Sequence, residues 1–141
     1  MSDILRRENI LLGCQAQPKE AIIREAGRMF TAGGYTTDGY TQSMLDKEKV
    51  FDTAIGNALA IPHGTEAGKA SVLHPGIIIM TFPAGTEWNC KTVHLVISIA
   101  ASGNEHVDIL GNIAIRCSDP DEVDAIVHST ADEIYTMFAD A

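Results

Sequence analysis

The sequence is poor in positive charge and in aromatic side chains. Ten Lys and Arg residues stand against nineteen Asp and Glu residues, which gives a formal net charge of -9. Nucleic acids and anionic membrane surfaces are bound through clustered Lys and Arg, so this balance argues against both as partners. It permits a basic protein partner or simple solubility. Because only 6% of the residues are aromatic, we expect a mostly aliphatic core.

Paired cysteines and long apolar runs are also missing. Cys14, Cys90 and Cys117 lie far apart without a CxxC spacing, so neither a zinc knuckle nor a thioredoxin motif is indicated. The apolar stretches fall short of the roughly 20 residues that span a bilayer. Arg6 and Arg7 are not followed by an apolar run, so we expect no secretory signal. These absences predict a cytoplasmic protein with reduced thiols and no direct membrane insertion.

The length of 141 residues predicts one domain over residues 1–141, and no repeat or linker interrupts the chain. A helix is predicted to start at Pro18 and to end at Gly33-Gly34. A second helix is expected to be capped by Thr36 or Thr37 and to carry Lys47 near its end. Residues 76–82 and 93–99 are strand-sized and rich in β-branched side chains.

The last third of the chain is predicted to be helical. Asn104 is the expected cap of the first of these helices. Asp119 followed by Pro120, and Thr130 followed three residues later by Glu133, are typical starts of two more. Strands interspersed with helices predict an α/β fold, a sandwich around one sheet whose strand order the sequence does not give.

His63 is the first candidate for chemistry. It stands between Pro62, which restricts the backbone, and Gly64, which permits a sharp turn and leaves space beside the ring. It also follows a short apolar run, and reactive side chains often lie at the end of a strand. An imidazole with a pKa near 6.5 keeps a nucleophilic neutral form at cytosolic pH. A turn histidine without a role is the competing interpretation.

His106 is the second candidate. Two residues after a cap at Asn104, it would stand beside unpaired backbone N–H groups at the positive end of a helix dipole. Such a place can hold an anion such as a phosphoryl group. We therefore expect His63 to act as nucleophile and His106 to stabilise the phosphoryl oxygens.

Rival chemistries have weaker signals. A zinc site built from His63, His106 and Glu105 or Asp108 is conceivable, but the sequence has no HExxH or similar spacing. Neither a GxSxG elbow nor a Walker loop is present, so a serine hydrolase and direct use of ATP are not indicated. The other three histidines are interpreted as structural; they are His74, His94 and His128.

Two stretches resemble a known family. Residues 40–49 and residues 55–65, the latter reading Ile-Gly-Asn-Ala-Leu-Ala-Ile-Pro-His-Gly-Thr, are similar to the IIA domain of the bacterial phosphoenolpyruvate-dependent phosphotransferase system. Residues 9–13 and 99–106 are also similar, and the mannitol branch matches best. The resemblance covers about residues 8–138, and Thr65 after the glycine favours the mannitol branch over the fructose and nitrogen-regulatory branches.

The resemblance implies a single mixed β-sheet flanked by helices on both faces. It implies a cofactor-free phosphotransferase component in which His63 accepts phosphate from the phosphocarrier protein HPr. His63 would pass the group to a cysteine of a IIB domain or subunit, which serves a membrane IIC component. His106 would match the second active-site histidine. The substrate would be mannitol or a related polyol.

Two positions depart from the family pattern. Lys47 stands where an arginine is expected near the active site, and it is a candidate phosphate contact that lacks the bidentate grip of a guanidinium. Asn57 stands where a glutamate is common, which removes a carboxylate partner for a cation or a histidine. We expect Leu59, Ile61 and Val107 to form an apolar docking rim. The alternative function is a phosphorylation-dependent regulatory binding protein of the same family that is not coupled to transport.

Overall fold

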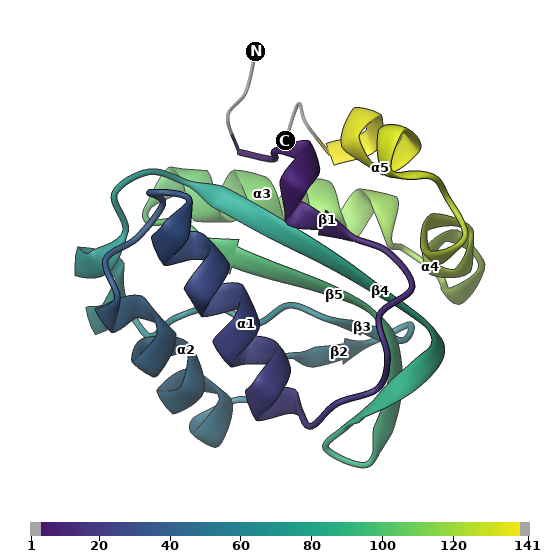
Figure 1. The fold of residues 1–141 in the computed structure, drawn as a ribbon, viewed down its shortest axis with the longest axis horizontal. Helices are drawn as coiled ribbons and strands as arrows, with labels where there is room; N and C mark the ends of the chain where they lie inside the picture. Colours follow the sequence, from purple (N-terminus) through teal and green to yellow (C-terminus); the bar gives the residue numbers. More distant parts are fainter. Residues whose placement is uncertain (1–3, 139–141) are drawn as a thin grey trace.

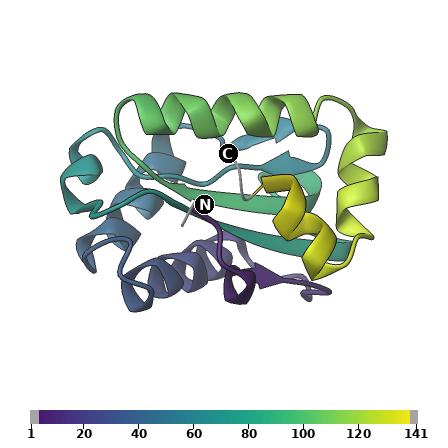
Figure 2. The same ribbon diagram turned by 90° about the horizontal axis from the view of Figure 1, so that it is seen from above.

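The computed structural model describes residues 4–138, which form one mixed sheet between two layers of helices (Figure 1). The sheet has five strands in the order β1-β4-β5-β3-β2. Helices α1 (Lys19–Ala32) and α2 (Gly39–Val50) cover one face, and α3 (Asn104–Arg116) lies along the other (Figure 2). Helices α4 (Pro120–Val127) and α5 (Ala131–Phe138) complete that second layer. The predicted α/β sandwich is confirmed.

A long antiparallel hairpin forms the centre of the sheet. Strand β4 (Gly76–Trp88) pairs with β5 (Lys91–Ala100) from Gly76 opposite Ala100 to Trp88 opposite Lys91. The connecting Asn89 and Cys90 both have positive φ, 53° and 68°, as in the tight turns that match the twist of a hairpin. Strand β4 runs six residues beyond the predicted end at Phe82, since a register shift between Thr81 and Thr86 accommodates the exposed Pro83.

Alternating side chains of the hairpin fill two separate aliphatic cores. Ile77, Ile79 and Ile97 are buried beneath α3, α4 and α5. Ile78, Met80 and Val96 face the opposite way and pack with residues of α1 and α2. Both faces of the strands are therefore covered, which explains why these segments read as nearly continuous apolar runs.

The helix starts partly match the predictions. The carboxylate of Asp119 caps α4 by accepting the N–H of Glu122 at 2.8 Å. Thr130 and Glu133 form the predicted capping box, with bonds of 2.8 and 3.2 Å. Helix α3 instead begins at Asn104 itself, because Gly103 adopts a φ of 61° and makes the turn out of β5.

The predicted cap of α2 at Thr36 or Thr37 is wrong. The helix begins at Gly39, after Asp38. Thr36 is buried and forms an isolated bridge with Val72, while the N–H of Thr37 donates to the carbonyl of Ser71 at 2.9 Å. The backbone of both threonines is thus used in tertiary pairing rather than at a helix end.

Short strands complete the sheet and determine where the site lies. Strand β1 (Ile10–Leu11) pairs in parallel with β4, and β2 (Ala54–Gly56) pairs in antiparallel fashion with β3 (Leu59–Ala60). Strand β3 runs parallel to β5, so their carboxyl ends lie at the same edge. The segments that follow these two strands, residues 61–65 and 101–106, are therefore neighbours. Within residues 4–138, the helices are too short or too polar to cross a membrane.

Candidate active site

The segment that carries His63 is held against the end of β5. The N–H of Ile61 donates to the carbonyl of Thr53, and the N–H of Ile99 donates to the carbonyl of Pro62, both at 2.9 Å. His63 itself forms an isolated parallel bridge with Ile99. Proline can join this edge because its carbonyl accepts a bond and its missing N–H is not needed there. The strand pairing thus continues past β3 and fixes the backbone of His63.

A buried tyrosine of α2 holds this turn in place through two hydrogen bonds. The hydroxyl of Tyr40 donates to the carbonyl of Ile99 at 2.8 Å and accepts the N–H of Gly64 at 2.9 Å. Burial raises the pKa of Tyr40 to about 12, so the hydroxyl keeps its proton and both bonds persist at neutral pH. Nearby, the hydroxyl of Ser43 accepts the N–H of Thr65 at 3.2 Å. Helix α2 therefore anchors the residues on the carboxyl side of His63.

A hydrogen bond to the backbone selects the tautomer of His63. Its Nδ1 lies 2.8 Å from the carbonyl oxygen of Ile61. A carbonyl oxygen only accepts hydrogen bonds, so in the neutral ring Nδ1 carries the proton and Nε2 carries the free lone pair. The half-buried ring thus has a defined nucleophilic nitrogen.

His106 stands beside His63, as predicted. The two ring centres are 5.3 Å apart, with 59° between the ring planes. His106 is the third residue of α3, so it lies in the first turn, where backbone N–H groups lack intrahelical partners. Its Nδ1 is buried and finds no hydrogen-bond partner among residues 4–138. His106 thus combines an unsatisfied polar atom with a position at a helix amino end, which favours anions.

Both imidazoles favour the neutral form. Burial is the main cause that lowers the pKa of His63, and the positive charges of Lys47 and Lys69 lower it further, against opposing effects of the Ile61 hydrogen bond and of Glu48. Burial also lowers the pKa of His106, and His63 and the two lysines lower it further, against an opposing effect of Glu66. The same lysines that disfavour an imidazolium would attract a phosphoryl group.

The family follows from comparison of the whole chain with known proteins. A model of the family described as the phosphoenolpyruvate-dependent sugar phosphotransferase system, EIIA 2, matches residues 3–141. The chain belongs to this family. It is accordingly a IIA component, one of the phosphotransferase components of that system.

Relatives with known names align with nearly the whole chain. The mannitol-specific phosphotransferase enzyme IIA component of Staphylococcus aureus is 39% identical over 142 residues, which cover 100% of this chain and 99% of the relative. Enzyme IIAMTL of Escherichia coli, solved in complex with phosphorylated enzyme IIBMTL, gives a TM-score of 0.87 at 34% identity and covers 97% of this chain and 99% of that one. The crystal structure of IIA mannitol from Escherichia coli gives 0.84 at 36% identity, covering 95% and 98%.

Lys47 lies close to the histidine pair but is seated over an aromatic ring. Its Nζ is 5.1 Å from the ring centre of Phe51, and that ring is 6.3 Å from the His63 ring in an edge-on arrangement. Lys69, on the short helix η2 (Ala67–Ser71), is the second cation and pairs with Glu66 at 3.1 Å. Sequence reasoning missed both Phe51 and Lys69. The only signal in the sequence was that Lys69 follows soon after His63.

Two expectations about the surroundings of the IIA site are wrong. Asn57 lies in the β2–β3 turn with a φ of 56°, and its side chain donates to the carbonyl of Cys117 at 3.2 Å, beyond the carboxyl end of α3. That end is about 16 Å along the helix from His106, so Asn57 is not part of the site. Leu59 and Ile61 do not form a docking rim, because they are 2% and 7% exposed within the core, whereas Val107 is 66% exposed.

The remaining histidines are separate from the pair, in agreement with their structural interpretation. Each ring nitrogen Nδ1 lies close to a backbone carbonyl: Pro75 for His74, Phe82 for His94 and Asp124 for His128. Throughout residues 4–138, the His, Cys, Asp and Glu side chains do not gather in groups of three or more that could hold a metal ion. Among the described residues, neither Glu105 nor Asp108 therefore joins the two histidines in a metal site.

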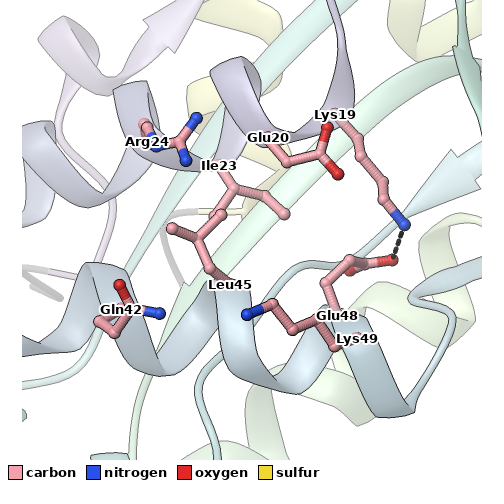
Figure 3. Close-up of a pocket in the computed structure, with 8 residues that line it drawn as sticks. All are labelled: Lys19, Glu20, Ile23, Arg24, Gln42, Leu45, Glu48 and Lys49. Atoms are coloured by element: carbon pink, nitrogen blue, oxygen red, sulfur yellow. Dashed lines mark ion pairs between the residues drawn. The ribbon is translucent and has the colours of Figure 1, made fainter.

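A hollow of about 290 Å³ lies between α1 and α2, separate from the histidine pair (Figure 3). Its wall includes the buried carboxylate of Glu48, which is 3.7 Å from Nζ of Lys19. Glu48 also accepts bonds from the hydroxyl of Thr53 at 2.6 Å and from the indole N–H of Trp88 at 3.0 Å. This network ties the end of α2 to the start of β2 and to the hairpin, so its role is structural.

A substitution of Gly64 tests the packing under His63. A Cβ at this position would lie 2.2 Å from Oγ of Ser43 and 2.5 Å from the Tyr40 ring, so Gly64→Ala is expected to lower the free energy of unfolding by about 1–3 kcal/mol. Gly111→Ala is the matched control, because its Cβ would meet open space within α3 and alanine favours a helix by up to about 1 kcal/mol. Urea denaturation measures both; equal stability of the two variants would contradict the packing described.

A second substitution tests the charge of Lys47. Lys47→Gln removes a positive charge that disfavours the imidazolium, so the pKa of His63 should rise while burial keeps it below its ordinary value. Lys47→Arg retains the charge and should leave the pKa low. NMR titration of the His63 ring gives the measurement, and an unchanged pKa in Lys47→Gln would mean that solvent screens this lysine from the site.

Proposed function

We propose that the chain acts in the cytoplasm as a single IIA domain, residues 1–141, that carries a phosphoryl group on Nε2 of His63. The observation that carries this proposal is the 2.8 Å bond between Nδ1 and the Ile61 carbonyl, which leaves Nε2 unprotonated beside His106. A neutral imidazole with a defined free lone pair is the form that attacks phosphorus.

The partners proposed are those of a sugar uptake relay. HPr is the expected donor, a IIB domain or subunit is the acceptor, and a membrane IIC component is served indirectly. Support for IIB comes from the Escherichia coli enzyme IIAMTL, solved in complex with phosphorylated IIBMTL. Support for mannitol or a related polyol comes from relatives named as mannitol-specific.

The transfer consists of two displacements at phosphorus. Nε2 of His63 forms a bond to the donor's phosphorus, and the bond from phosphorus to the donor breaks with its electron pair. The proton stays on Nδ1, where the Ile61 carbonyl stabilises the charge of the phosphorylated ring. In the second step a cysteine thiolate of IIB attacks phosphorus, and the P–Nε2 electron pair returns to His63.

Charge on the moving phosphoryl group is stabilised by groups already in place. His106, in the first turn of α3, lies beside His63, and both lysines act electrostatically on the pair. Phosphoryl transfer depends mainly on such positioning and electrostatic stabilisation. A lysine gives a point charge without a bidentate grip, which suits a group that must be released again.

The half-buried His63 is accessible to a partner. Exposed apolar side chains stand next to each histidine: Phe51 beside His63 and Val107 immediately after His106. The net charge of -9 would favour a basic partner face, with association that slows as salt screens the charges.

Replacing the two histidines separates their roles. His63→Ala is expected to abolish phosphorylation by phosphoenolpyruvate, Enzyme I and HPr, because the attacking nitrogen is lost. His106→Ala should still accept phosphate, with transfer slowed roughly 10²-fold, the typical effect of removing one charge-stabilising group. Labelling with [32P]phosphoenolpyruvate measures both, and His128→Ala serves as control because that histidine is exposed and remote from the pair.

Full labelling of His63→Ala would disprove the assignment. Transfer of the label from the native protein to a IIB cysteine distinguishes transport from the regulatory alternative. A phosphorylated chain that never passes its label to IIB would be a regulatory binding protein.

A further inference from the structure

Phe51 is an aromatic side chain left in solvent at the mouth of the site. It is 47% exposed, although it immediately follows α2. Its ring lies 6.3 Å from the His63 ring with 62° between the planes. His63 therefore has two rings as neighbours, Phe51 and His106. The aromatic side chain is exposed where the chemistry is expected.

The backbone of Phe51 is fixed on both sides. Its N–H donates to the carbonyl of Lys47 at 2.9 Å and closes the last turn of α2. Two residues later, the hydroxyl and N–H of Thr53 donate to the buried carboxylate of Glu48 at 2.6 and 3.3 Å. The loop between α2 and β2 is thus short and held at each end. The position of the ring beside His63 is a built feature of the fold.

Phe51 also positions the nearest cation of α2. Nζ of Lys47 lies 5.1 Å from the ring centre, within the range in which an aromatic face attracts an ammonium group. A flexible lysine side chain loses considerable freedom when it is held in one place, so it needs such a contact to stay near the histidines. Without the ring, the ammonium would be released to solvent.

We propose that Phe51 protects a phosphoryl group on His63 from hydrolysis by covering one side of the imidazole against water, and that it also seats Lys47 where its charge can hold the group. This inference rests on the proposed phosphocarrier function. In the hydrolysis that it opposes, a water oxygen bonds to phosphorus and the P–Nε2 bond breaks. The electron pair of the broken bond returns to Nε2, the attacking water loses a proton, and inorganic phosphate leaves.

The ring opposes that competing reaction in two ways. An apolar ring cannot activate a water molecule, and it occupies space from which water would approach the phosphorus. A carrier must keep its phosphoryl group until a protein acceptor arrives, so the residue acts on the lifetime of the intermediate. Phe51 is therefore a positioning residue.

The experiment measures the lifetime of the phosphorylated protein. The native chain and its variants are loaded with phosphoenolpyruvate, Enzyme I and HPr, freed of the loading proteins, and followed by 31P NMR. Phe51→Ala is expected to shorten the lifetime at least about threefold. Phe51→Tyr keeps the ring and should restore the native lifetime. Ile115→Ala is the control, because it removes an apolar side chain that is 75% exposed near the far end of α3.

A second measurement covers variants whose lifetime is too short for NMR. Phosphate release is followed during continuous loading without IIB, and it should rise in Phe51→Ala and in Phe51→Ser. Native lifetime and native phosphate release in both small variants would overturn the inference while leaving the proposed function intact. Failure of the native chain to accept phosphate would overturn the proposed function, and the inference with it.

Discussion

The hydrogen bond between Nδ1 of His63 and the carbonyl of Ile61 determines which nitrogen is available for chemistry. That bond requires a particular path of the backbone around His63. The parallel pairing of β3 with β5 continues as far as Pro62 and fixes this path. The same pairing places the loop after β3 beside the start of α3, and so brings His106 to within 5.3 Å of His63, centre to centre. A single strand register thus fixes the position, tautomer and neighbour of the proposed nucleophile.

Two lysines stand near the histidine pair of a chain that is negative overall, although Glu48 and Glu66 partly offset their effect. The protein carries a formal net charge of -9, yet Lys47 and Lys69 both act on the two histidines. Burial and these cations keep the imidazoles neutral, which preserves nucleophilicity. The cations also provide an attractive environment for phosphate. This combination is suited to a group that must be accepted, held briefly and released.

The residues that could be predicted from sequence are those with strong local requirements. Pro62 and Gly64 indicated that His63 lies in a restricted turn, and Asp119 predicted a helix cap, because both effects act over a few residues. Contacts between residues far apart in the sequence were harder to predict. The bridge from Thr36 to Val72 prevented the expected cap.

Side chains near the site were predicted less well than the histidines themselves. Asn57 was associated with the site because a glutamate is common there in the family, but the β2–β3 turn directs it to the far end of α3. Leu59 and Ile61 are apolar and adjacent to His63, and strand pairing buries them. Phe51 and Lys69 become neighbours of the pair when α2 and η2 pack around the turn, and the sequence signals this only weakly, through the closeness of Lys69 to His63 along the chain.

The most direct test of the account is a 15N NMR spectrum of the His63 ring at neutral pH, taken before and after phosphorylation. We predict that Nδ1 is protonated and Nε2 is bare in the free protein, and that phosphate is bonded to Nε2 afterwards. A proton on Nε2 in the free protein, or phosphate on Nδ1 after loading, would contradict the role assigned to the Ile61 carbonyl.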